Sequence, residues 1–184
     1  MCIVINTQCV IAQNTSFFLQ KQTILDNDGY RPNVIMGQDH YFNDKFGMSF
    51  LQIINRNKAT VYSGFAYKFN KHVSLKTFLG VIVNTQEFPL DGAAGVVVNK
   101  KKWINLSYLG YNNTGYWYFH TTTYEIHQHF KAGVHAQRFV GVGPRFDIPI
   151  GKFNLWNAGV YNIDTKNFGF VIGTILTFNN ISKK

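Results

Sequence analysis

The chain has 184 residues, which is enough for one domain with a substantial core. Only 15% of its residues are charged while 16% are aromatic, and this balance is unusual for a domain that faces water on every side. The mean hydropathy of −0.10 excludes a protein built from transmembrane helices, but it suits a structure in which only alternate residues are apolar.

Residues 1–12 are apolar with small polar interruptions and resemble the end of a secretory signal peptide. Val10 and Ala12 stand three and one residues before a possible cleavage point. The basic start of such a signal is missing, so we expect a truncated signal peptide, with an ordinary N-terminal strand as the alternative. Cys2 and Cys9 both lie in this segment, and their spacing indicates neither a metal site nor a disulfide framework.

Residues 13–45 are the least regular part of the chain and predict either an irregular segment or a first hairpin. Residues 46–178 read as short alternating strands separated by turns rich in Asn, Lys and Gly. We expect these strands at 46–54, 60–69, 73–83, 93–98, 103–111, 116–129, 132–143, 144–148, 153–161 and 168–178. Residues 179–184 form a basic tail. No segment has a helical period, so the sequence predicts an all-β fold, one antiparallel up-and-down β-barrel of about 8–10 strands.

Alternation within the strands separates two faces. In residues 168–178 one face carries large apolar side chains, whereas the other is mostly small. In residues 73–83 one face is apolar and the other face carries Lys76. In residues 60–69 the less apolar face carries Lys68. An apolar side opposite a side of Gly, Ser and Lys is typical of a transmembrane β-barrel. We therefore expect Lys68 and Lys76 in the lumen, as candidates for contact with a ligand.

The aromatic residues gather near strand ends, as the girdle of a membrane barrel requires. The residues assigned to this girdle are Trp103, Tyr111, Tyr116, Trp117, Tyr118 and Phe178. One residue disagrees, because Arg138 falls on the same face as Val134 and Val140, where it would cost about 2–4 kcal/mol at mid-depth in lipid. A soluble barrel whose apolar face points inward around a ligand is the alternative.

The possible signal end, the girdle and the final strand ending in Phe178 together resemble the small outer-membrane β-barrel superfamily of Gram-negative bacteria, in the style of uncharacterised Bacteroidetes-type members. The resemblance covers residues 45–178 and rests on pattern rather than on a diagnostic motif. It implies a barrel in the outer membrane and names no substrate. The chain departs from the pattern after Phe178, where six residues follow a strand that often ends such chains.

The densest group of polar side chains lies in residues 120–131. On a strand, Glu125, His127 and His129 would share one face, where two histidines at i and i+2 could reach one metal ion with the carboxylate as a third ligand. The same residues could serve as base and partner in a lipid-modifying enzyme. The simpler interpretation is the polar lumen face of one strand, and we expect neither a bound metal nor a catalytic residue.

The formal net charge of +9 lies largely in the turns and in the C-terminal tail. Basic turns around a barrel could meet anionic lipid headgroups or the phosphates of lipopolysaccharide. They could equally prevent strand edges from pairing with other chains. The basic and aromatic run at residues 100–103 is weak evidence for nucleic acid. The expected partner is the lipid bilayer, and the sequence leaves the oligomeric state open.

The sequence favours a non-enzymatic outer-membrane β-barrel with a structural, adhesive or narrow-pore role and without a cofactor. One alternative is a soluble barrel, periplasmic or secreted, that binds a hydrophobic ligand. The other alternative is a lipid-modifying barrel enzyme.

Overall fold

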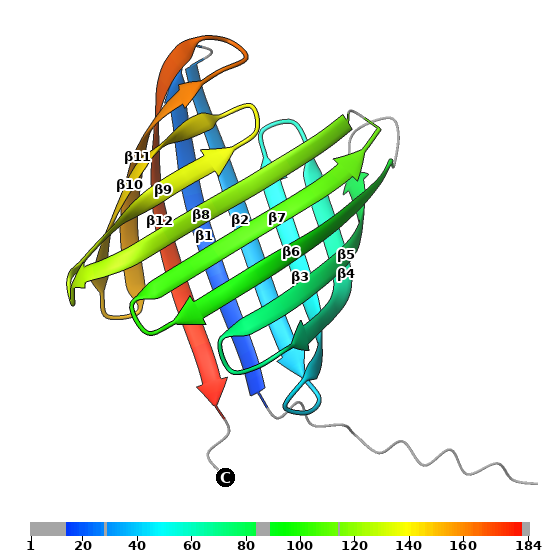
Figure 1. Cartoon of the computed structure of the whole chain (residues 1–184). Coiled ribbons are helices and arrows are strands. Elements are labelled where there is room, and N and C mark those ends of the chain that lie inside the picture. The colour runs from blue at the N-terminus through cyan, green and yellow to red at the C-terminus, as the bar shows by residue number, and fades with distance from the viewer. Residues whose placement is uncertain (1–13, 28, 84–88, 114, 182–184) are drawn as a thin grey trace, which may run out of the picture.

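The computed structural model describes residues 14–27, 29–83, 89–113 and 115–181, and every element in these ranges is a β-strand (Figure 1). The strands are β1 (Asn14–Asp26), β2 (Gly29–Tyr41), β3 (Phe46–Asn55), β4 (Ala59–Lys68), β5 (Val73–Val83), β6 (Leu90–Lys100), β7 (Trp103–Asn112), β8 (Gly115–His127), β9 (Phe130–Gln137), β10 (Gly141–Ile150), β11 (Phe153–Asn162) and β12 (Asn167–Ile181). No helix in the described ranges is long and apolar enough to cross a membrane.

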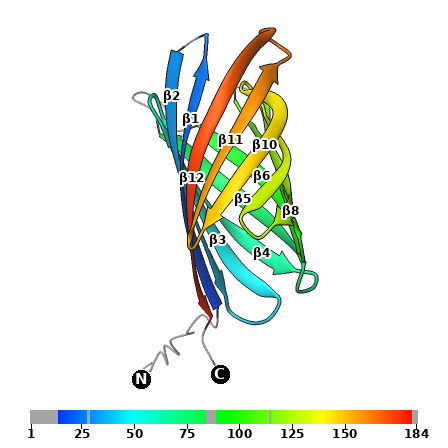
Figure 2. The ribbon, with the colours of Figure 1, turned by 90° about the vertical axis from the view of Figure 1, so that its left-hand side faces the viewer.

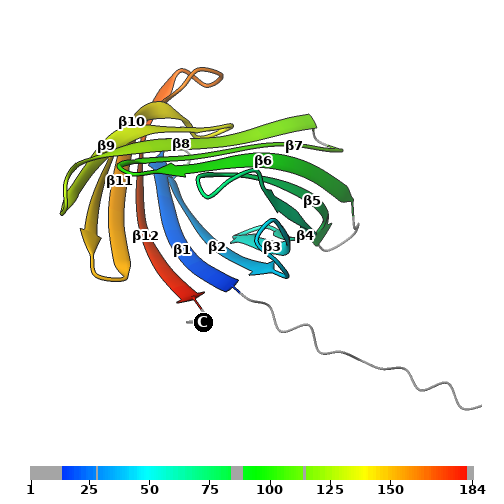
Figure 3. The same cartoon turned by 60° about the horizontal axis from the view of Figure 1, so that its bottom comes forward.

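Each strand pairs antiparallel with its neighbours in sequence, and β1 pairs with β12 to close the barrel. The strands surround one interior in the view of Figure 3. The closing seam is continuous from Asn14 opposite Ile181 to Leu25 opposite Phe170. As a result, β1 begins and β12 ends at the same end of the barrel (Figure 2). We call this end the terminal end and the other end, which carries the β1–β2 turn, the far end.

The predicted class, an antiparallel up-and-down β-barrel, is confirmed, but the barrel has twelve strands rather than about eight to ten. The two additional strands are β1 and β2, which form a hairpin within residues 13–45. The last strand continues to Ile181, so residues 179–181 belong to it rather than to a tail. Residues 1–12, with the predicted signal peptide and both cysteines, lie outside the described residues.

The turn between β9 and β10 lies at residues 138–140 and not at Gly143–Pro144, where the sequence predicts a break. Pro144 lies inside β10 opposite Val134, and the pairing of β10 with β11 skips residues 143 and 144 because proline has no N–H to donate. Arg138 consequently lies in a turn at the far end of the barrel. The sequence pattern places this arginine on the lipid-facing side of a strand at mid-depth. In the structure it does not lie there.

The alternation of the strands places large apolar side chains on the outside and a mixture of small, polar and aromatic side chains on the inside. On β12, Phe168 and Phe170 are 78% and 60% exposed, whereas Val171 is fully buried. On β5, Leu79 is 64% exposed, whereas Lys76 is only 8% exposed. This is the reverse of a soluble barrel, in which the apolar face points inward.

The interior is packed differently in its two halves. Between β1 and β9–β12 the interior is filled by a cluster of small apolar side chains around one tryptophan: Ile24, Val140, Trp156, Ala158, Val160 and Val171. The amide groups of Gln22 on β1 and Gln137 on β9 meet across the barrel at 3.5 Å. Because these two strands are not neighbours in the sheet, this contact separates the filled half from the half enclosed by β1–β8.

Candidate functional site

The half of the barrel enclosed by β1–β8 contains a cavity of about 870 Å³. Its lining includes residues of the β3–β4 turn, the β9–β10 turn and the adjoining strand ends, so it reaches the far end of the barrel. Basic side chains line it there: Arg31, Arg56, Lys58 and Arg138. Amide side chains line its wall, among them Gln20, Gln22, Asn33 and Asn112. The cavity is therefore a vestibule with a basic mouth and a wall of amide and apolar side chains.

An aromatic layer lies on the inner wall of β4–β8, where Tyr62, Phe78, Tyr108 and Trp117 pack together. Ring centroids are 6.0 Å apart for Tyr62 and Phe78, and 5.9 Å apart for Phe78 and Tyr108. Phe18 on β1, from the opposite wall, packs against the same cluster. Four of the five rings line the vestibule itself: Phe18, Tyr62, Tyr108 and Trp117.

These rings lie flat against the wall because a glycine stands opposite each of them on the neighbouring strand. The cross-strand pairs are Phe18 with Gly37, Tyr62 with Gly80, Tyr108 with Gly95, Trp117 with Gly110 and, in the filled half, Trp156 with Gly173. A Cβ atom built on Gly110 would lie 2.3 Å from the Trp117 ring. The small inner residues thus provide room for the rings.

The carboxylate of Asp91 fixes two of the rings. It accepts hydrogen bonds from the Tyr62 hydroxyl at 3.0 Å, from Nε1 of Trp117 at 3.0 Å and from Nδ2 of Asn112 at 2.9 Å. Asp91 is only 2% exposed. A buried carboxylate with several donors is held in one orientation, so the aromatic layer has a defined shape.

At the mouth, two of the four basic side chains are held by neighbours and two lie in an exposed turn. Arg31 forms an ion pair with Asp26. The Arg138 guanidinium lies 3.7 Å above the Tyr116 ring and donates a hydrogen bond to the Tyr116 carbonyl. Arg56 and Lys58 lie in the exposed β3–β4 turn. The rim of the vestibule therefore has an excess of positive charge.

Below the aromatic layer, towards the terminal end, an ion pair joins β5 to β2. Nζ of Lys76 lies 2.7 Å from the Asp39 carboxylate, which also accepts a hydrogen bond from the Ser49 hydroxyl. Nζ of Lys68 lies 3.4 Å above the Tyr41 ring. None of these residues lines the vestibule. Both lysines predicted in the lumen thus point inward, but they lie in a separate layer.

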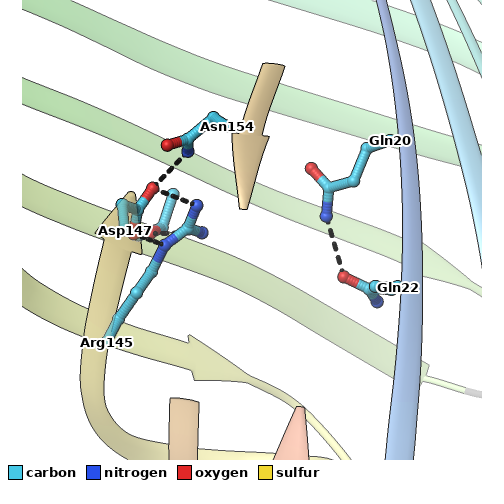
Figure 4. A network of polar contacts seen from close by, with 6 residues as sticks. Gln20, Gln22, Arg145, Asp147 and Asn154 are labelled. Carbon is cyan, nitrogen blue, oxygen red and sulfur yellow. Dashed lines mark hydrogen bonds and ion pairs between the residues drawn. The ribbon is translucent and has the colours of Figure 1, made fainter. Parts of the chain in front are cut away.

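In the filled half, a second ion pair is almost completely buried (Figure 4). Arg145 makes two hydrogen bonds to Asp147, from Nε at 2.6 Å and from Nη2 at 2.9 Å, and a third to the Thr121 hydroxyl at 3.1 Å. Its guanidinium also lies 4.0 Å above the Trp156 ring. Asn154 donates to the same carboxylate. This pair was not predicted, although opposite charges two residues apart on one strand are a signal for it in the sequence.

The polar group predicted in residues 120–131 does not form one cluster. Glu125 lies on the same inward side of β8 as Thr123, and it is opposite Lys131 on β9. A register shift between Glu125 and His127 interrupts the alternation, so His127 and His129 lie exposed at the β8–β9 turn with ring centroids 5.7 Å apart. Among the described residues no three His, Cys, Asp or Glu side chains are placed to hold a metal ion.

The aromatic residues assigned to a girdle take different positions. Trp103, Tyr111, Tyr116 and Phe178 are between 42% and 70% exposed near strand ends. Tyr118 is half-buried. Trp117 points inward to Asp91, because alternation places it on the opposite side of β8 from Tyr116.

No family model matches the chain, and no curated protein matches it. Among solved structures, the chain is similar to the KdgM porin with a TM-score of 0.63 and 12% sequence identity, over 88% of this chain and 99% of that chain. The same values hold for the KdgM porin in complex with disordered oligogalacturonate. The NanC porin gives a TM-score of 0.55 and 8% identity, over 86% of this chain and 98% of that chain. At these identities the similarity shows the fold alone: this chain has the barrel fold of the KdgM and NanC porins.

Proposed function

We propose that the protein is a narrow channel of the outer membrane that admits small anionic solutes through the vestibule, without chemical change. The observation that carries the proposal is a closed barrel with an apolar outside and an interior cavity that has a basic mouth and amide side chains on its wall. The outside favours a membrane location, and the charges at the mouth favour an anionic solute.

The outer surface supports a membrane location. Its exposed side chains include a large set of apolar residues from β3–β5 and β10–β12, among them Phe50, Phe65, Leu79, Phe146, Ile148, Leu155, Phe170 and Ile172. Exposing so many large apolar side chains to water would be costly. A closed barrel is also one of the two structures whose backbone hydrogen bonds are all satisfied in lipid. The soluble-barrel alternative requires the opposite polarity.

The charges of the vestibule support an anionic solute. Arg56 and Lys58 lie at its rim, and Arg31 and Arg138 also line it. Against these four basic side chains the described lining holds one acidic residue, Asp91, which is buried and bonded to three neutral donors. A cleft lined by one sign of charge concentrates ions of the opposite sign. The KdgM porin, which shares the fold, has been solved in complex with oligogalacturonate, which is a polyanion.

The test is conductance of the purified protein in planar bilayers under a salt gradient. We expect a reversal potential that shows preference for anions. The double variant Arg56→Ala/Lys58→Ala should bring the ratio of anion to cation permeability towards one, because it removes the two exposed rim charges. The matched control, Lys71→Ala/Lys102→Ala, removes two charges from turns at the terminal end and should leave the ratio near its original value. A cation-selective channel, or the absence of conductance, would contradict the proposal.

A further inference from the structure

The outer wall of β7 and β8 carries a cluster of polar side chains, Asn105, Ser107, His120 and Thr122, which we call the β7–β8 patch. Ser107 and His120 are opposite each other in the register, as are Asn105 and Thr122. The Ser107 hydroxyl donates to Oδ1 of Asn105 at 3.1 Å and lies 2.8 Å from Nδ1 of His120. Because a hydroxyl has one hydrogen, Nδ1–H of His120 is the donor to Ser107 in this scheme.

This arrangement leaves hydrogen-bonding groups directed outward. With its proton on Nδ1, the imidazole of His120 has an acceptor at Nε2, and the amide of Asn105 has two N–H donors. Within the described part of the chain, neither group has a hydrogen-bond partner. The patch therefore offers both a donor and an acceptor to a neighbour.

Aromatic side chains show how deep the patch lies. Ser107 is four positions from Trp103 and four from Tyr111, and its partner His120 is equally far from Tyr124 and Tyr116. Trp103 pairs with Tyr124 and Tyr111 pairs with Tyr116, so the rings form two rows. The two rows of rings are about 27 Å apart along the strands. At the usual strand tilt this is roughly 20 Å along the barrel axis, which is close to the height of the apolar band of a membrane barrel. The patch thus lies at the middle of that band.

The strands on either side of the patch carry short side chains next to it. The outward neighbours in register are Ala136 beside His120, Val134 beside Thr122 and Val96 beside Ser107. By contrast, the outward positions of β10–β12 carry Phe146, Leu155 and Ile172. Figure 1 shows β6, β7 and β8 side by side as one broad face. Small side chains allow the backbone of a neighbouring protein to approach closely in a membrane.

We propose that the β7–β8 patch is the contact at which a second copy of this chain packs in the membrane, forming a two-fold dimer. Lipid tails offer neither donors nor acceptors, so they leave the outward amide and imidazole groups unsatisfied. A two-fold axis along the membrane normal brings identical residues together at the same depth. The Asn105 amides of the two copies then meet at one depth, where each offers N–H donors and an Oδ1 acceptor to the other. This inference rests on the membrane location of the proposed function.

The experiment is cross-linking in membranes of a chain in which Cys2 and Cys9 are replaced by Ser. Ser107→Cys and Asn157→Cys are compared with a short bismaleimide reagent. Asn157 is the matched control, because it is exposed on β11 and flanked by Phe146 and Ile172 in the register. We expect a band of twice the monomer mass for Ser107→Cys and not for Asn157→Cys. The heat-dependent mobility of each variant on a gel shows separately that its barrel is folded.

Three results would overturn the inference: no dimer band, equal bands for both variants, or a Ser107→Cys adduct of another mass, which would show that a different protein covers the patch. None of these three results would contradict the proposed channel function. A chain recovered outside the membrane would instead refute the membrane location, and the dimer with it. A second measurement is energy transfer between labelled copies in liposomes. Asn105→Leu should raise the dissociation constant about three- to fifteen-fold for each hydrogen bond lost, whereas Asn157→Leu should leave it unchanged.

Discussion

The Arg145–Asp147 pair can be used to test whether water is excluded from the filled half of the barrel, between β1 and β9–β12. Both side chains are less than 5% exposed, and each satisfies the other through two hydrogen bonds. Arg145→Met would leave the Asp147 carboxylate buried without its cation, although the Asn154 amide would still donate to it (Figure 4). Breaking one partner of a buried pair in this way costs about 3–5 kcal/mol. We therefore expect the free energy of unfolding to fall by that amount.

The double variant Arg145→Met/Asp147→Leu should be more stable than either single variant. It leaves no uncompensated charge, and replacing a buried ion pair by apolar side chains of similar volume is often neutral or stabilising by about 1–4 kcal/mol. The measurement is urea unfolding in detergent or lipid, followed by tryptophan fluorescence, because Trp156 stacks directly on the guanidinium. If the double variant lost the sum of the two single losses, the pair would be solvated by lumen water, and the filled half would not be dry.

Two further predictions concern the β1–β8 half. Gly110→Ala would place a Cβ atom 2.3 Å from the Trp117 ring, so we expect a loss of about 1–3 kcal/mol in unfolding free energy; Gly92→Ala, which meets nothing within 4 Å, is the control and should be near neutral. Lys76→Met would leave the Asp39 carboxylate without its cation, so we expect the single-channel current carried by anions to fall. Adding Asp39→Asn should restore that current, and failure of the second change to restore it would show that the ion pair does not border the conducting path.

The fold was predictable where the alternation is regular. In residues 73–83 and 168–178 the two faces differ so strongly that the sequence alone separates outside from inside. β1 was harder to recognise because its inward positions carry Gln20 and Gln22, and its outward face carries Lys21, so neither face is uniformly apolar. The polar interior of a barrel gives a weak signal in any single strand.

The site was less predictable than the fold, because it depends on which strands meet across the interior. Alternation places Lys68 and Lys76 inside, but the partner of Lys76 is Asp39, 37 residues away. Asp91 and its three donors come from β4, β6, β7 and β8, and their convergence follows from register rather than from any motif. His127 was misplaced by one register shift, because a bulge changes the side on which every later side chain lies.

The seam between β1 and β12 constrains how the protein can be made. It joins residues 14–25 to residues 170–181, so the barrel cannot close until nearly the whole chain has been delivered. Before that moment β1 and β11 are open sheet edges, with a row of unpaired N–H and C=O groups that lipid cannot satisfy. Contacts so distant in sequence also form slowly. A chain that stops before residue 167 therefore has no smaller version of this barrel to adopt, and a partner that shields the open edges during assembly would act on β1 and β11.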